Sequence, residues 1–242
     1  MIFSTIILYS NQLIFPLYVK LLGGGKAVDI EISTKLLLMI AIPLTCGIIV
    51  IAKPLLFLLN PDYIVGENIV RILSLYSFVY VINSLFTLMV LGSEKIDMLK
   101  NIKVSEILRS SLFIIPSIDV SRLIIYNIAL VIFIYAVSSE NIVSENFGIN
   151  WALILFLSNI VTTGYIISIA MKKSSFKFPW KNISNYILSA IVMTILLLFS
   201  LDFIIYNEKT LIFVFEIIKL VLIGTMSYFI ILITIDKETR DL

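Results

Sequence analysis

Five polar or basic side chains stand inside stretches of this sequence that are otherwise apolar. They are Asn11, Gln12, Lys53, Arg71 and Asn83. Polar groups at lipid depth are costly, so each needs a partner or a functional reason to be there. Amides join helices by hydrogen bonds, and a basic side chain either reaches the headgroup layer or holds an anion in a wet cavity. We predict these five residues as candidates for lining a substrate cavity, with a structural role left open for each.

Other kinds of chemistry have little support in the residues present. The chain has no histidine, which excludes His-based acid–base catalysis and His-ligated metals. Its single cysteine, Cys46, excludes an intrachain disulfide. Glu216 and Lys219 are three residues apart on one helical face, so we predict that they form an ion pair. No catalytic residue, cofactor or metal site is predicted, and we expect the chain not to be an enzyme.

The elements that carry these residues are long apolar stretches. Hydrophobic residues make up 60% of the 242 residues and charged ones 14%, and the mean hydropathy is +1.08. A soluble domain has about 25% charged residues, and a helix needs about 20 apolar residues to cross a bilayer. We therefore predict an all-α fold, a polytopic membrane helical bundle of seven transmembrane helices. The predicted spans are Met1–Leu22, Thr34–Leu59, Asn68–Gly92, Asp119–Ser138, Ile149–Met171, Asn185–Ile205 and Thr210–Ile235.

The start of the fourth span is left open. The stretch Val104–Ile118, which precedes the predicted span Asp119–Ser138, is amphipathic and contains Pro116. Such a stretch either lies along the membrane interface or extends the span.

Basic residues fall mostly in and beside alternate loops. Fourteen of the 18 Lys and Arg residues lie on one side of the predicted membrane. Lys53, Arg71 and Lys209 lie on the other side, and Lys219 lies inside a span. The positive-inside rule then places the N-terminus outside and the C-terminus in the cytoplasm of a multi-pass protein of the cytoplasmic membrane. A first helix that begins outside without a polar leader favours a chain preceded by further helices, and translocation of a short tail is the alternative.

Part of the sequence resembles a known transporter family. The stretch from Lys35 through Pro43 and Ala52-Lys53-Pro54 to Tyr63 is similar to the polysaccharide (oligosaccharide) flippases of the MATE-like superfamily. The helix that follows, with Asn83 inside it, resembles the next helix of that family. Further on, Phe147-Gly148-Ile149, the basic loop Lys172–Lys181 and the span Asn185–Ile205 resemble its late helices.

The resemblance implies a function and an organisation. It implies the downstream half of a flippase that moves a lipid-linked sugar to the outer leaflet by alternating access, with the upstream half missing. One membrane lobe of six spans would cover residues 1–205, and the last helix with a cytoplasmic tail would cover residues 206–242. The implied partners are a lipid-linked sugar, membrane lipid and the missing N-terminal half, with no nucleic acid. A MATE-type drug/cation antiporter, or a non-transporting subunit or fragment that needs a partner half, are the alternatives.

The topology can be tested with two engineered cysteines in a chain whose Cys46 is replaced. A cysteine at Ser175, in the loop of four lysines, should resist an impermeant thiol reagent in intact cells because that loop is cytoplasmic. A cysteine at Ser144, in the loop that contains Glu140 and Glu145, should react. The opposite labelling pattern would reverse the predicted topology.

Overall fold

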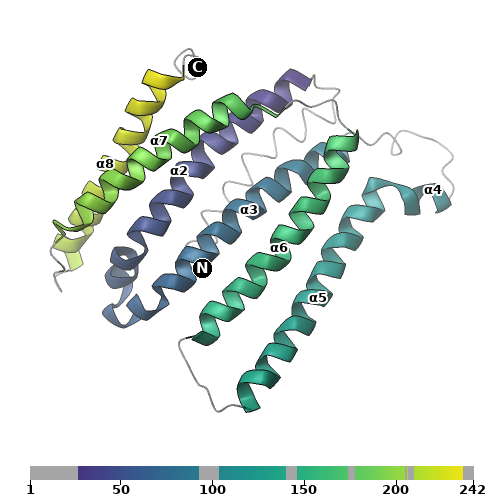
Figure 1. The fold of residues 1–242 in the computed structure, drawn as a ribbon, viewed down its shortest axis with the longest axis horizontal. Helices are drawn as coiled ribbons and strands as arrows, with labels where there is room; N and C mark the ends of the chain where they lie inside the picture. Colours follow the sequence, from purple (N-terminus) through teal and green to yellow (C-terminus); the bar gives the residue numbers. More distant parts are fainter. Residues whose placement is uncertain are drawn as a thin grey trace. The chain divides into compact units, whose positions relative to one another are not determined.

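The computed structural model describes residues 27–92, 104–139, 146–173, 178–204, 206 and 210–236, and every regular element among them is a helix. The predicted first span, Met1–Leu22, lies outside the described residues together with Asn11 and Gln12. The helices in chain order are α2 (Ala27–Leu59), η1 (Pro61–Gly66), α3 (Glu67–Gly92), α4 (Val104–Arg109), α5 (Ser111–Ser139), α6 (Asn146–Lys173), α7 (Trp180–Leu201) and α8 (Thr210–Ile235) (Figure 1). The predicted all-α fold is confirmed.

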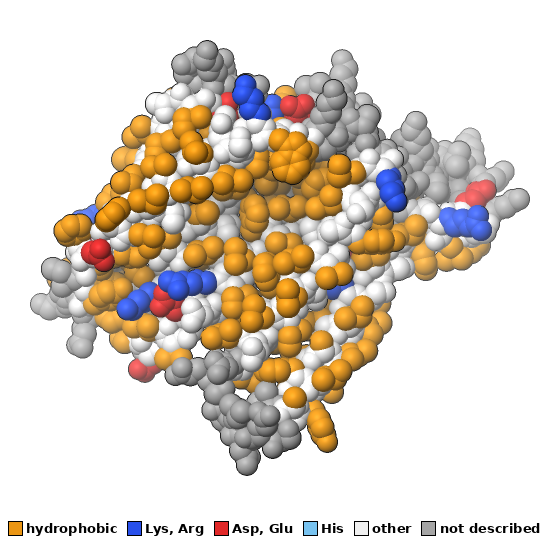
Figure 2. Space-filling view, in the orientation of Figure 1, with side chains coloured by type: hydrophobic (Ala, Val, Ile, Leu, Met, Phe, Trp, Pro, Cys, Tyr) orange, Lys and Arg blue, Asp and Glu red, His pale blue; other side chains and the backbone are white. Residues whose placement is uncertain are grey.

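Six helical segments of the described chain are long and apolar enough to cross a membrane. Their bounds are Thr34–Leu59, Pro61–Leu91, Ser111–Ala136, Phe147–Lys172, Trp180–Leu201 and Ile212–Ile235. Figure 2 shows that hydrophobic side chains dominate the visible face and that charged ones are few. Because an apolar outer surface of this extent suits lipid rather than water, the helices form a polytopic membrane bundle.

The helix bounds agree closely with the predicted spans for α3 and α8 and at the end of α2. The helix α3 begins one residue before the predicted Asn68 and ends at the predicted Gly92. The helix α8 has the predicted bounds, and α2 ends at the predicted Leu59. The turn between α2 and α3 forms because Pro61 stands at the first position of η1 and the Asn60 side chain accepts a hydrogen bond from the Asp62 amide at 3.0 Å. The helix α7 begins five residues before the predicted Asn185 and ends four before the predicted Ile205.

The structure decides between the two readings that the sequence left open for Val104–Ile118. The helix α5 begins at Ser111 rather than at Asp119 and continues through Pro116, so Ser111–Ile118 extends the fourth span, while Val104–Arg109 forms the separate short helix α4. The serines of this polar stretch find hydrogen-bond partners within the helix. Ser117 and Ser121 donate to the carbonyls one turn earlier, at 2.7 Å each.

The chain divides into two compact units, each described here by itself. The first comprises the described residues of Met1–Thr34 and Leu75–Phe178, and the second those of Lys35–Ser74 and Pro179–Leu242. The predicted boundary between residues 205 and 206 stays a prediction.

In the second unit, α7 and α8 pack against each other as a hairpin. The helices approach closely at Gly224, where a Cβ atom would lie 3.1 Å from Leu197 Cδ1. At the open end of the hairpin, buried Asn182 donates through Nδ2 to Asp236 Oδ2 at 3.2 Å. The predicted ion pair on α8 is confirmed, because Lys219 Nζ lies 2.7 Å from Glu216 Oε1.

The helix α2 is joined to this hairpin near Pro43, the first of its two prolines. Pro43 has no amide hydrogen, so the carbonyl of Met39, one turn earlier, lacks its helical donor. The hydroxyl of Tyr228 on α8 donates to that carbonyl at 2.9 Å, and Tyr228 is fully buried. A backbone group freed by a proline within lipid must find another partner, and here the partner fixes α8 against α2.

We predict that Tyr228→Phe lowers the free energy of unfolding by about 1 kcal/mol, because it leaves the Met39 carbonyl without a donor. The matched control is Tyr135→Phe on α5, where the side chain is 80% exposed, and it should change stability by less than about 0.5 kcal/mol. Thermal unfolding of the purified chain in detergent measures both. Equal stability of the two variants would show that the hydrogen bond contributes nothing.

Candidate functional site

Lys53, a predicted site residue, lies near the end of α2 in the second unit. Its side chain is exposed, and its Nζ lies 5.7 Å from the centre of the Tyr206 ring. Tyr206 itself packs with the rings of Phe57 and Phe213, whose centres lie 5.1 and 5.6 Å away. The ammonium group therefore rests over an aromatic cluster, an arrangement that stabilises a cation.

Arg71, a second predicted site residue, lies at the start of α3 in the same unit. Its Nε donates to the carbonyl of Ile49 on α2 at 3.2 Å, and its guanidinium pairs with Glu67 one turn earlier. Because Ile49 is one turn before Lys53, both cations lie at the same end of the α2–α3 hairpin, and the Glu67 carboxylate there pairs with Arg71.

Tyr206 completes this end of the second unit. Burial, and then the negative charge of Glu67, raise the pKa of the Tyr206 hydroxyl above its ordinary value. Tyr206 is therefore a neutral hydroxyl at physiological pH, able to donate a hydrogen bond beside two cations.

Asn83, the third predicted site residue that is described, is buried in α3 within the first unit. It is 5% exposed, and its Oδ1 has no hydrogen-bond partner in the part of the chain that the structure describes. A buried amide oxygen without a donor costs about 1–3 kcal/mol. Asn83 belongs to the first unit, whereas Lys53 and Arg71 belong to the second.

The first unit contains a polar cluster that the sequence analysis missed, centred on Arg122 of α5. Its Nη1 donates to Asn159 Oδ1 on α6 at 3.2 Å, and it also hydrogen-bonds to the side chain of Tyr76 on α3. Asn159 is fully buried and donates through Nδ2 to the Tyr76 carbonyl at 3.4 Å. Arg122 Nη2 lies 3.8 Å from Asp119 Oδ1, which is beyond hydrogen-bond distance. Three helices thus meet at one guanidinium.

Each of the three residues of the cluster lies near the midpoint of its own candidate span, as counted in residues from the two ends of the span. Arg122 comes 11 residues after Ser111 and 14 before Ala136, the two ends of its span. Asn159 is 12 residues from the start of its span and 13 from its end, and Tyr76 is 15 residues from either end of its own. All three residues therefore lie near the midpoints of their candidate spans, the position that corresponds to the middle of a bilayer crossed by these helices.

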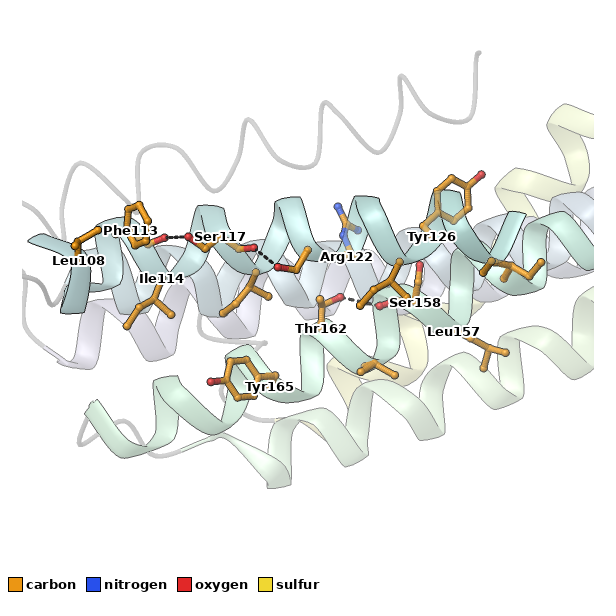
Figure 3. A pocket seen from close by; sticks show the side chains of 16 residues that line it. Leu108, Phe113, Ile114, Ser117, Arg122, Tyr126, Leu157, Ser158, Thr162 and Tyr165 are labelled. Atoms are coloured by element: carbon orange, nitrogen blue, oxygen red, sulfur yellow. Dashed lines mark hydrogen bonds between the residues drawn. The ribbon is translucent and has the colours of Figure 1, made fainter. Parts of the chain in front are cut away.

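A groove runs beside Arg122 between α5 and α6 (Figure 3). It has a volume of about 730 Å³ and walls that are mostly apolar, with Ile125 and Ala129 of α5 facing Leu157 and Val161 of α6. Volumes of about 300–1,000 Å³ are usual for sites that take one small molecule. At one end of the groove, Trp151 Nε1 donates to the Tyr126 hydroxyl at 2.6 Å.

The sequence contained a signal for this cluster. Asn159 is a lone amide inside an apolar stretch, as Asn83 is, and the same argument on buried polar groups applies to both. Arg122 was placed at the cytoplasmic end of its span because that span was predicted to begin at Asp119. Once the helix begins at Ser111, the arginine moves to the middle of the membrane.

Comparison of the chain with family models, curated proteins and solved structures found no match. Among the described residues, no group of three or more His, Cys, Asp or Glu side chains is placed to hold a metal ion. The described residues thus offer two candidate sites, the cations at the α2–α3 end and the Arg122 cluster with its groove.

We predict that Asn159→Leu lowers the free energy of unfolding by about 2–3 kcal/mol, because it removes a hydrogen bond from a largely buried guanidinium. The control is Asn127→Leu on α5, because Asn127 is exposed and donates only to the Leu123 carbonyl of its own helix. It should change stability by less than about 0.5 kcal/mol. Chemical unfolding in detergent micelles compares the two, and a smaller loss for Asn159→Leu would contradict the assigned role.

Proposed function

We propose that the chain is part of a transporter that moves a lipid-linked oligosaccharide or polysaccharide precursor across the cytoplasmic membrane by alternating access. In this proposal the N-terminus lies outside, the C-terminus lies in the cytoplasm, and an upstream half completes the transporter. The resemblance of the Lys35–Tyr63 stretch to the flippases supports the proposal, and so do six spans that leave little chain for anything but the membrane part.

The observation that carries the proposal is the pair of cations at one end of the α2–α3 hairpin. Lys53 and Arg71 come from different helices of the second unit, Arg71 donates to the Ile49 carbonyl one helical turn before Lys53, and Glu67 is the carboxylate that pairs with Arg71. A phosphate-linked headgroup needs compensating positive charge where it meets low dielectric. Lys53 is exposed, and its contact among the described residues is the Tyr206 ring rather than a carboxylate, so it remains able to bind a phosphate.

The helix that carries Lys53 also suits a transporter that changes shape. Pro43 and Pro54 interrupt α2 at two places, and helices broken by proline are frequent where transporters bend. Pro54 directly follows Lys53, so bending there would redirect the ammonium group. In the conformation described, Tyr228 fixes the helix near Pro43 and leaves Pro54 as the place to bend.

The double variant Lys53→Ala with Arg71→Ala should abolish flipping, because no cation at this end would then compensate the phosphates. The test is complementation of a flippase-deficient strain by the full chain, produced together with an upstream lobe. Lys219→Ala is the matched control, since it removes one lipid-depth cation from α8 and should leave flipping intact.

Membrane insertion and protein amount are measured for each variant, so that a folding defect is recognised. Full activity in the double variant would show that the two cations only anchor the helices at the interface. Failure of the unaltered chain to complement with its upstream lobe would contradict the flippase proposal itself.

A further inference from the structure

We propose that the groove between α5 and α6 binds a long-chain fatty acid, with the carboxylate on Arg122 and the aliphatic chain along the groove. The inference goes beyond the proposed function, because binding here requires neither transport nor an upstream half. It starts from the position of Arg122, a largely buried cation near the middle of a membrane span.

The protein does not use the full hydrogen-bonding capacity of Arg122. A guanidinium has five N–H donors. Asn159 and Tyr76 take some of them, and Asp119 remains at 3.8 Å with a side chain that is 42% exposed. The Nε also has no partner within the described part of the chain, but it is buried, so a ligand in the groove would have to bind through Nη1 and Nη2. An oxyanion is the complementary partner, because a carboxylate meets a guanidinium through two parallel hydrogen bonds.

The groove walls restrict how polar the rest of the ligand can be. Four hydroxyl groups line the groove besides the Tyr126 and Tyr165 phenols, from Ser117, Ser121, Ser158 and Thr162. Each of the four donates to a carbonyl of its own helix, at 2.7–2.8 Å. These groups have no donor left for a sugar, and the remaining walls are apolar. A ligand with one compact anionic group and an aliphatic remainder therefore matches the groove.

Charge and volume select a single-chain monoanion. Among the described residues, Arg122 is the one cationic side chain that lines the groove, and Asp119 offsets part of its charge. One partly compensated positive charge balances one negative charge at most at this depth, which favours a carboxylate over a pyrophosphate. A volume of about 730 Å³ is in the range for one small ligand, so one aliphatic chain is favoured over the two of a phospholipid.

The fluorescence of Trp151 can report whether the groove is occupied. Trp151 is hydrogen-bonded to Tyr126, which lines the groove, and the sequence has one other tryptophan, Trp180. In a Trp180→Phe background, a brominated chain in the groove should quench the fluorescence of Trp151 by contact. The probe is dibrominated stearate in vesicles of zwitterionic lipid at alkaline pH, where the carboxyl group is ionised.

Dibrominated stearate should quench Trp151 more strongly than its uncharged methyl ester at equal mole fraction, and unbrominated stearate should reverse the difference. In Arg122→Gln, about tenfold more unbrominated stearate should be needed to displace the brominated acid, as expected for loss of a charge-assisted hydrogen bond. The control Lys219→Gln also removes one positive charge, from α8, and should leave the displacement of the brominated acid by unbrominated stearate unchanged. Equal quenching by acid and ester, or full binding by Arg122→Gln, would overturn the proposal.

A second variant keeps the test decisive if Arg122→Gln fails to fold. Val161→Phe adds a ring to the groove at a side chain that is 74% exposed, and it leaves the Arg122 cluster intact. It should reduce quenching by the acid to the level of the ester, and unchanged quenching would contradict binding in the groove. If an unbrominated anionic phospholipid competes as well as stearate, the single-chain carboxylate is the wrong ligand.

Discussion

Within the hydrocarbon layer no water can satisfy a polar group on a helix, so each such group must be met by another part of the protein. The Met39 carbonyl, freed by Pro43, receives the Tyr228 hydroxyl from α8. The Arg122 guanidinium receives Asn159 from α6 and Tyr76 from α3. In both places the polar contact joins different helices in one register, whereas apolar side chains could join the same helices in several registers.

The two contacts differ in what they leave unsatisfied. At Met39 one acceptor meets one donor, both are shielded, and the result is a fixed junction between α2 and α8. At Arg122 the donors outnumber the acceptors, and a groove passes alongside. Fully satisfied polar groups stabilise a structure, whereas buried ones with spare capacity are more often sites of function. The physical difference between a structural contact and a candidate binding site therefore lies in this donor count.

The cations at the α2–α3 end, Lys53 and Arg71, differ from the Met39 carbonyl and from Arg122 in their position along the helices. They are nearer the ends of their helices, where solvent and headgroups lower the cost of charge. Lys53 is held by an aromatic ring and Arg71 by a carboxylate and a carbonyl, so the two differ in how readily they can exchange a partner. Exchange at Lys53 needs no ion pair to break, which makes this residue the more suitable contact for an arriving phosphate.

How far the sequence predicts this structure depends on which interactions determine each feature. Hydropathy determines the length of a span, so α8 and the end of α2 were predicted to the residue, and spacing determines local pairs such as Glu216 and Lys219. The sequence left the start of α5 open because its first turns are polar, and hydropathy does not register that their serine hydroxyls bond to carbonyls of their own helix. The partners of Arg122 and Met39 come from other helices, and one sequence alone carries no record of such long-range contacts.

The depth of the groove is the quantity on which this account depends most directly. A nitroxide spin label on a cysteine at Val161, in a chain whose Cys46 is replaced, reports depth through its collision rates with oxygen and with a water-soluble nickel complex. Because Val161 is two residues from Asn159 and faces the groove, the label should collide freely with oxygen and little with nickel, as at the centre of a bilayer. Strong nickel collisions would place the label in water or in the headgroup layer, and Arg122 would then be an interfacial residue rather than a charge at mid-membrane depth.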